Sequence, residues 1–203
     1  IGVRKQNGTY RPTNQNILVN SNKISFAISA ADRFSGSSNP NGIYRAELFL
    51  DGKFLSGFEM DSVSYDETRY LNAHIDFKLK NHGGPFVQHL AQPPGYINGI
   101  YKTAKKEDGV IRLKDNARHQ VLIKVYDVNE NVSNLEFDLQ KNGDGNTGSL
   151  VDQGKLFRPG QINVFENDKV WFYLPEKAIY DSFHFRYTEL FSGGKTTVSY
   201  THL

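Results

Sequence analysis

Apolar side chains recur at alternate positions along this chain, and pairs of residues that favour tight turns interrupt them at short intervals. Six such pairs, each Asn-Gly or Asp-Gly, occupy residues 41–42, 51–52, 98–99, 108–109, 142–143 and 144–145. A period of two places successive side chains on opposite faces of a β-strand. Asn-Gly and Asp-Gly readily adopt the positive φ angles that hairpin turns need. The pattern therefore predicts an all-β fold.

The clearest local unit is a hairpin in which residues 43–50 and 53–60 flank Asp51-Gly52, the pair that best fits a type I′ turn. Residues 23–30 predict an earlier strand with Ile24, Phe26 and Ile28 on one face. Later strands are predicted at residues 97–102, 110–113, 120–126 and 132–139. We expect a β-sandwich over residues 1–140 with a core that includes Phe26, Ile28, Leu48, Leu50, Leu122 and Val125.

Two segments depart from the strand pattern. Residues 66–94 fit neither the strand nor the helix period, and we predict a long irregular insertion with a short helix that ends near residues 81–84. Residues 141–149 have no apolar side chain and are predicted to be a linker.

Strands are predicted again beyond the linker, at residues 155–157, 161–165, 169–174, 182–187 and 196–200. A β-sandwich usually takes about 100 residues. Residues 150–203 could form a small sheet that leans on the first domain, but we favour a second β domain that is incomplete, because residues 198–203 end in strand-like sequence with no turn after it.

The composition excludes several classes of function. The 203 residues include 24 basic and 22 acidic ones, without a dense basic run beyond residues 102–106, so neither nucleic acid nor an anionic membrane surface is indicated as a partner. The absence of cysteine excludes disulfides and cysteine-containing metal sites. No apolar run approaches the length of a membrane span. The chain opens at Ile1 without a signal peptide, and we expect it to be a piece of a longer protein.

Residues 127–133 (DVNENVS) resemble the start of a calcium loop, because Asp127, Asn129 and Asn131 present oxygen atoms at alternate positions. Val132, however, stands where an EF-hand loop needs glycine, and the closing residue is Asp138 rather than glutamate. The flanking residues are strand-like, whereas an EF-hand requires helices. We predict a β-hairpin and keep a calcium loop as the alternative. Residues 142–148 also alternate oxygen side chains, and there we favour a flexible linker.

Among candidate metal ligands, His74 and Asp76 would share one face of a strand, with Asp66 or Glu67 as a further oxygen donor. We favour the alternative that these carboxylates form a structural ion-pair network around Arg69. The remaining histidines in strands, His89, His119 and His184, are expected to be isolated and half-buried.

Aromatic side chains could supply stacking surfaces for sugars. Most are expected to pack in the core or at sheet edges instead. The candidates are Tyr44, Tyr65, Tyr70, Tyr96, Tyr101, Trp171, Tyr173, Tyr180 and Tyr187.

Five segments of the predicted first domain carry a family likeness when taken together: residues 28–32 (ISAAD), 42–53 (GIYRAELFLDGK), 66–76 (DETRYLNAHID), 109–113 (GVIRL) and 118–133 (RHQVLIKVYDVNENVS). They resemble the accessory region of lysostaphin-type zinc endopeptidases of Bacteroides-group bacteria, with a looser similarity at residues 174–180. In that family an immunoglobulin-like β-sandwich lies beside a catalytic domain that cuts peptidoglycan cross-links. The D-x-x-G-N-x-S turn common in bacterial immunoglobulin-like domains appears at residues 127–133 with Glu130 in place of glycine.

The resemblance implies an immunoglobulin-like or fibronectin-like β-sandwich in the periplasm or cell envelope of a Gram-negative bacterium. The peptidase family holds zinc through an H-x-x-x-D pair and an H-x-H pair, and this sequence contains neither. We therefore expect no catalytic residue and no cofactor in this chain, with zinc confined to a catalytic domain outside it. The remaining metal candidates are weak ones: His74, Asp76, Asp127, Asn129 and Asn131.

The expected function is that of a non-catalytic accessory module that positions or regulates a peptidoglycan endopeptidase domain absent from this chain. Its expected partners are that domain and, beyond it, peptidoglycan or another envelope glycan or protein. The alternative is an independent envelope binding or adhesion module that recognises glycan or protein.

Overall fold

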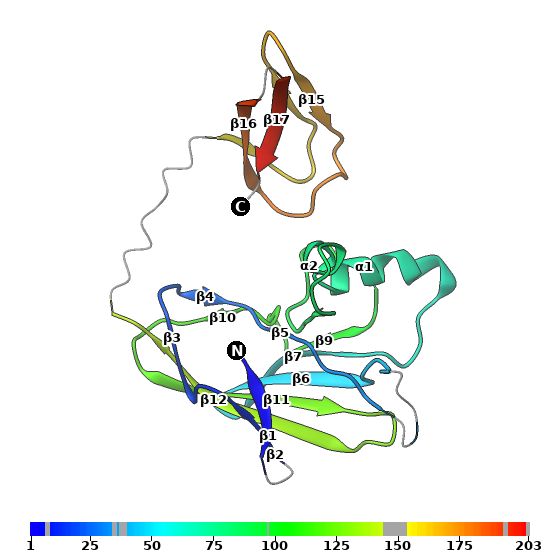
Figure 1. The fold of residues 1–203 in the computed structure, drawn as a ribbon, viewed down its shortest axis with the longest axis vertical. Coiled ribbons are helices and arrows are strands. Elements are labelled where there is room, and N and C mark those ends of the chain that lie inside the picture. The colour runs from blue at the N-terminus through cyan, green and yellow to red at the C-terminus, as the bar shows by residue number, and fades with distance from the viewer. Residues whose placement is uncertain are drawn as a thin grey trace. The chain divides into compact units, whose positions relative to one another are not determined.

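The computed structural model describes residues 1–6, 9–33, 36, 40–96, 98–143, 154–192 and 195–201, without the side chains of residue 69 and of the residues beyond 189. The chain divides into two compact units, residues 1–146 and 147–203. Strands dominate both units (Figure 1), so the predicted all-β fold is confirmed.

The first unit is built on one six-stranded sheet in the order β3-β12-β11-β6-β7-β9. The parallel pair in this sheet is β3 with β12, and the other neighbours are antiparallel. The strands are β3 (Asn16–Val19), β6 (Arg45–Leu50), β7 (Lys53–Glu59), β9 (Tyr101–Thr103), β11 (Arg118–Tyr126) and β12 (Val132–Lys141).

Both hairpins predicted from the sequence are present in this sheet. Strands β6 and β7 are joined by Asp51 and Gly52, whose φ angles of 50° and 75° are those of a type I′ turn. Strands β11 and β12 flank residues 127–131. The hairpin prediction for the DVNENVS segment is therefore confirmed.

Short ladders face the large sheet in place of long strands. β4 (Lys23–Ile24) pairs with β10 (Ile111–Arg112), and β5 (Ala27–Ile28) pairs with β8 (Gln88–His89). A separate hairpin comprises β1 (Val3–Gln6) and β2 (Thr9–Pro12). The prediction of one continuous strand over residues 23–30 is wrong, because its two halves pair with different partners.

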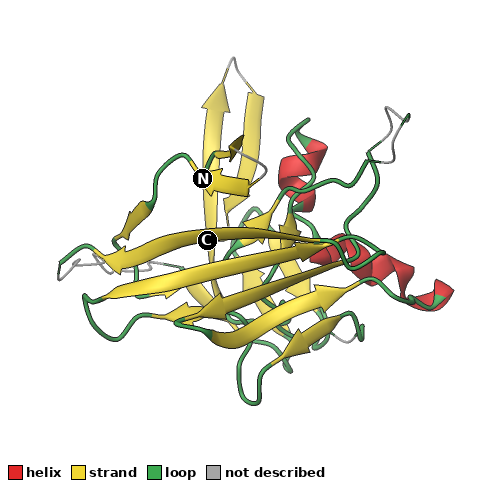
Figure 2. Cartoon of the chain, turned by 90° about the horizontal axis from the view of Figure 1, so that it is seen from below, coloured by secondary structure: helices red, strands yellow, loops and turns green. Residues whose placement is uncertain are grey.

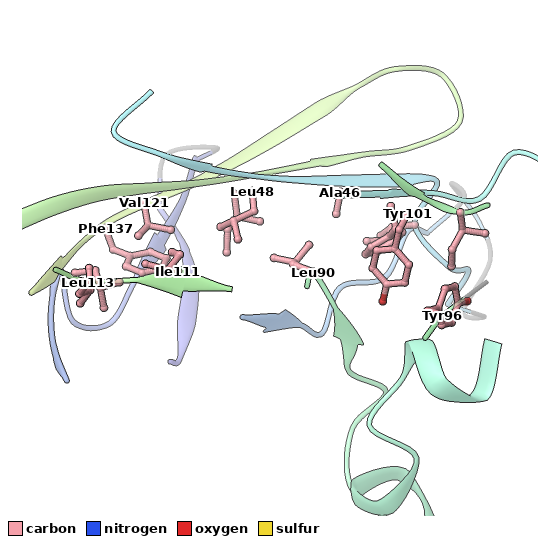
Figure 3. Close-up of a cluster of buried hydrophobic side chains, with 14 residues drawn as sticks. Ala46, Leu48, Leu90, Tyr96, Tyr101, Ile111, Leu113, Val121 and Phe137 are labelled. Carbon is pink, nitrogen blue, oxygen red and sulfur yellow. The ribbon is translucent and has the colours of Figure 1, made fainter. Parts of the chain in front are cut away.

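The core of the first unit lies between the large sheet and the short ladders. In Figure 3, Leu48, Val121 and Phe137 project from the sheet toward Ile111 and Leu113. The predicted inward face of residues 23–30 is confirmed, because Ile24, Phe26 and Ile28 all pack against this cluster. The core also includes Ala46, Phe58, Leu90, Tyr96, Tyr101, Ile123 and Leu139.

Leu122 lies on the face of β11 opposite to the core, contrary to the prediction. Val121 and Ile123 are buried, and Val125 packs against them, so the odd-numbered residues of the strand point inward. Leu122 pairs instead with Phe49 on the outer face of β6. Because residues 121–123 are all apolar, the sequence does not show which of them face inward. Pairing with β6 decides this.

The irregular insertion carries the helices of the first unit. A 3-10 helix, η1 (Tyr65–Tyr70), leads into α1 (Leu71–His74), and α2 (Phe77–Asn81) follows. These helices lie toward one end of the long strands (Figures 1 and 2). The predicted helix that ends near residues 81–84 is confirmed, and Gly83 has a left-handed φ of 80° just beyond it.

Gly109 shows why glycine is needed in the predicted turn at residues 108–109. Its φ is 84°, and a Cβ atom at this position would lie 2.2 Å from the hydroxyl oxygen of Ser56 and 2.7 Å from the Cα atom of Ala91. Ser56 is itself buried and donates a hydrogen bond to the carbonyl of Leu90. The turn thus packs directly on the core.

The second unit contains the five strands predicted for it. A three-stranded sheet comprises β13 (Lys155–Phe157), β16 (Phe183–Ser192) and β17 (Lys195–Thr201), and a two-stranded ladder comprises β14 (Asn163–Glu166) and β15 (Trp171–Leu174). Phe157, Phe172 and Phe185 stack together in its core, and Phe165 packs against Phe185 at a tilt of 54°. Most of the predicted linker lies outside the described residues, and the incompleteness of this domain stays a prediction.

Candidate functional site

The prediction that His74 lies on a strand is wrong. His74 lies at the end of α1 and is 1% exposed. Its Nδ1 atom lies 2.8 Å from the hydroxyl of Tyr101, and its Nε2 atom 3.1 Å from the side-chain amide of Gln88. The Tyr101 hydroxyl donates its hydrogen to the carbonyl of His89. Nδ1 therefore carries the imidazole proton, and Nε2 accepts from Gln88.

Burial controls the charge of this histidine. Desolvation, together with a smaller repulsion from His89, lowers the pKa of His74 from 6.5 to about 4. The ring also packs edge-on against Phe58, with centroids 4.4 Å apart. His74 is thus a neutral side chain of the core, with both nitrogen atoms hydrogen-bonded.

Asp76 has a structural role different from that of His74. It is the N-cap residue of α2, and its carboxylate accepts a hydrogen bond of 2.9 Å from the backbone amide of Leu79. The two residues do not share a strand face, because the chain passes from one helix to another between them. The side chain of Arg69, the predicted centre of an ion-pair network, lies outside the described residues.

Asp127 organises the turn between β11 and β12. One carboxylate oxygen accepts from the backbone amides of Asn129 and Asn131, at 2.8 and 2.9 Å, and the other accepts from the side-chain amide of Asn131 at 2.7 Å. The hydrogen bonds with Asn131 and Asn129 lower the pKa of Asp127. This carboxylate therefore stabilises the hairpin turn. Of the segment at residues 142–148, most lies outside the described residues.

His119 is not isolated, because it contacts Asp115, four residues earlier, and Asp51, which is 68 residues away in the sequence. Its Nδ1 atom lies 2.7 Å from a carboxylate oxygen of Asp51, and its Nε2 atom 3.1 Å from one of Asp115. The hydrogen bond with Asp51, reinforced by Asp115, raises the pKa of His119. The hairpin turn at residues 51–52 brings Asp51 to β11, a contact that no local pattern reveals.

The described parts of the chain contain no group of three or more His, Cys, Asp or Glu side chains placed to hold a metal ion. They also contain no helix with the length and apolar character needed to cross a bilayer. Comparison with family models, curated proteins and solved structures found no match.

A groove of about 840 Å³ opens on the inner side of the large sheet in the first unit. Its apolar wall includes Phe26, Val125 and Leu135, and Asp32 and Asn131 lie among its polar lining residues. Its volume is in the range of ligand-binding grooves, and its lining is mixed, with polar and apolar residues both well represented.

The candidate aromatic residues differ in their exposure and contacts. Tyr96 and Tyr101 are buried in the core, and the hydroxyl of Tyr44 donates to Glu59. Tyr65, the first residue of η1, is 93% exposed. Trp171 and Tyr173 are both exposed on β15, with ring planes 12° apart and centroids separated by 5.7 Å. This last pair, the β15 ring pair, has the geometry of a small stacking surface.

Proposed function

We propose that this chain is a non-catalytic accessory region of a cell-envelope peptidoglycan endopeptidase, which positions or regulates a catalytic domain carried elsewhere. The proposal includes an immunoglobulin-like character for the first unit and a location in the periplasm or envelope of a Gram-negative bacterium. It starts from the resemblance of roughly residues 16–140 to the accessory region of lysostaphin-type peptidases.

The backbone of Glu130 is the observation that carries the proposal. Its φ of 62° lies in the left-handed region that favours glycine, and it occupies the glycine position of the D-x-x-G-N-x-S turn. A left-handed backbone is the conformation that glycine at this position would provide, so this turn supports the resemblance although the residue type departs from the family pattern. An ion pair between the Glu130 carboxylate and the Arg45 guanidinium, which also lies 4.0 Å from the centre of the Tyr126 ring, accompanies this conformation.

The roles of the chemically active side chains support a non-catalytic assignment. His74 is locked between Tyr101 and Gln88 in the core, Asp76 caps a helix, and Asp127 caps a turn. Residues 66–76 contain the densest group of candidate metal ligands in the resemblance. Within them, His74 and Asp76 have structural roles instead. Metal-assisted hydrolysis instead needs ligands that leave a coordination position open to water.

Two experiments test the proposal: a cleavage assay on this chain, and sequencing of the gene that encodes it. Purified residues 1–203, incubated with peptidoglycan and zinc, should release no new amino termini above a buffer control. The gene that encodes them should also encode H-x-x-x-D and H-x-H pairs, and that catalytic domain should cut peptidoglycan at a different rate when residues 1–203 are deleted. Chelator-sensitive cleavage by residues 1–203 alone, or an unchanged rate after deletion, would contradict the proposal.

The groove in the first unit favours a second candidate, an independent envelope module that binds a glycan or protein. Its mixed lining suits recognition of a ligand that is part apolar and part polar. A gene without zinc-ligand pairs, together with a chain that binds envelope material by itself, would favour this candidate over the accessory role.

A further inference from the structure

The β15 ring pair combines strong exposure with a shared orientation. Trp171 is 64% exposed and Tyr173 is 41% exposed. Because they are two positions apart on a strand, both side chains leave the same face of the β14-β15 ladder. Ile162 adds a third large apolar side chain, 53% exposed, immediately before β14.

The opposite face of the same strand holds this surface in place. Phe172, between the two exposed residues, stacks on Phe185 in the core of the second unit, with centroids 4.8 Å apart and planes 10° apart. Phe165, its partner across the ladder, packs on Phe185 at 5.0 Å. The outward direction of Trp171 and Tyr173 therefore follows from the burial of Phe172.

Polar contacts fix the turn that precedes the β15 ring pair. The side-chain oxygen of Asn167 accepts from the backbone amides of Lys169 and Val170, at 2.9 and 2.8 Å. The Lys169 ammonium contacts the Glu189 carboxylate of β16 at 2.8 Å. A ligand that contacts these rings thus meets a surface that is already ordered, which lowers the entropic cost of binding.

The groups beside the rings are polar enough to orient a hydroxylated ligand. In the ladder, Trp171 lies directly across from Glu166, which is exposed, and Tyr173 lies across from Val164. A carboxylate accepts hydrogen bonds from hydroxyl groups, and an aromatic face packs against apolar C–H groups. A pyranose ring offers both kinds of group, with C–H bonds on its faces and hydroxyls around its rim.

The size of the surface argues against a protein partner. The ladder has four residues in each strand, so it is about 13 Å long, with about 5 Å between its two strands. A stable protein interface takes about 800 Å² from each partner. Two or three sugar residues suit this patch, whereas a folded protein would extend well beyond it.

We propose that Trp171 and Tyr173, with Glu166 across the ladder, form a glycan-binding site that stacks pyranose rings of a polysaccharide. The choice of an N-acetylated glycan as ligand rests on the proposed envelope function, whereas the ring geometry is independent of it. Through this site the second unit would hold the chain on the polymer while a catalytic domain acts nearby.

The chain has one tryptophan, Trp171, so its fluorescence reports directly on this site. Residues 1–203 should be titrated with chitohexaose, an oligomer of N-acetylglucosamine, and sedimented with purified peptidoglycan sacculi. We expect a saturable fluorescence change and retention on the sacculi. Calorimetric titration, which does not need the tryptophan, should show that Trp171→Ala and Tyr173→Ala each weaken binding by about tenfold or more.

Matched variants separate stacking from general effects. Tyr65→Ala removes an exposed tyrosine of the first unit and should bind as the unchanged chain does. Tyr173→Phe retains the ring and should lose less affinity than Tyr173→Ala, while Glu166→Gln should weaken binding by removing the carboxylate acceptor. Thermal unfolding checks that each variant is folded, which the exposure of both rings leads us to expect.

Three results would overturn the proposal: no response to chitohexaose or sacculi, binding that Trp171→Ala leaves unchanged, or a fluorescence response to phosphatidylcholine vesicles but not to glycan. If glycan binding depends on the β15 ring pair while deletion of residues 1–203 leaves peptidase activity unchanged, the site is supported and only the accessory role fails.

Discussion

The Nδ1 atom of His74 lies 2.8 Å from the hydroxyl oxygen of Tyr101, and both side chains are buried beneath the large sheet. The hydroxyl also donates a hydrogen bond to the carbonyl of His89. One oxygen atom therefore connects α1, β8 and β9. This small network attaches the insertion helices to the core. Burial without bulk water makes each of its hydrogen bonds costly to lose.

Tyr101→Phe tests this network by removing one oxygen atom and keeping the ring. His74 Nδ1–H and the His89 carbonyl would both lose a partner, and we expect a loss of about 1–3 kcal/mol in the free energy of unfolding. Urea denaturation at neutral pH measures it. Tyr180→Phe, at a position 62% exposed, is the control and should change stability by less than about 0.5 kcal/mol. Equal effects of the two substitutions would rule out the network.

The low pKa of His74 predicts a loss of stability in mild acid. The unfolded chain gains a proton at His74 below pH 6.5, whereas the folded chain resists protonation until pH falls to about 4. The stability contributed by the neutral ring is therefore complete above pH 6.5 and declines through that window. At about 1.4 kcal/mol for each tenfold difference in proton affinity, the loss approaches about 3 kcal/mol.

Urea unfolding at several pH values checks this decline. His74→Gln should flatten the profile between pH 6.5 and about 4, and His82→Gln, measured alongside, is the control for loss of an exposed histidine. A profile that keeps its slope in His74→Gln would place the titrating group elsewhere.

His119 should act in the opposite direction, at higher pH. Asp51, with Asp115, raises the pKa of His119, so the protonated ring stabilises the fold fully below the unfolded pKa of 6.5. This contribution is lost as pH rises through the folded pKa. His119→Gln should be less stable than the unchanged chain near pH 6 by up to about 1 kcal/mol, since the pair is partly solvated.

The measurement compares the two chains from about pH 6 upward, and His74 is present in both, so its contribution cancels in their difference. The stability difference between His119→Gln and the unchanged chain should shrink as pH rises, and high salt should reduce it at the lower pH. A difference that is independent of pH would mean that His119 contributes by packing alone.

Glu130 allows backbone strain to be measured without confusing it with charge. Glu130→Ala and Glu130→Gly both remove the ion pair with Arg45, but only glycine relieves the left-handed φ of 62°. The glycine variant should therefore be more stable than the alanine variant by about 1 kcal/mol. Thermal or urea unfolding of the two variants side by side provides the comparison, and a less stable glycine variant would contradict the strain.

The sequence by itself determined the local β-structure. Asp51-Gly52 needs two positive φ angles and therefore predicts its hairpin, and the polar residues 127–131 between two strand-like runs predict the next one. The five strands of the second unit and the short helix of the insertion follow from the same short-range rules. These elements depend on residues within a few positions of one another.

Only the tertiary structure decided which faces are buried and which distant residues meet. β3 joins β12 in parallel across more than 100 residues, and His119 meets Asp51 across 68. Where apolar residues are consecutive in a strand, distant parts of the chain also decide which of them face the core. Leu122 points away from the core between two buried neighbours, and Trp171 and Tyr173 point outward on either side of Phe172. In such runs either face could be buried, and the choice follows from the strand that pairs alongside and the side chains that pack beneath.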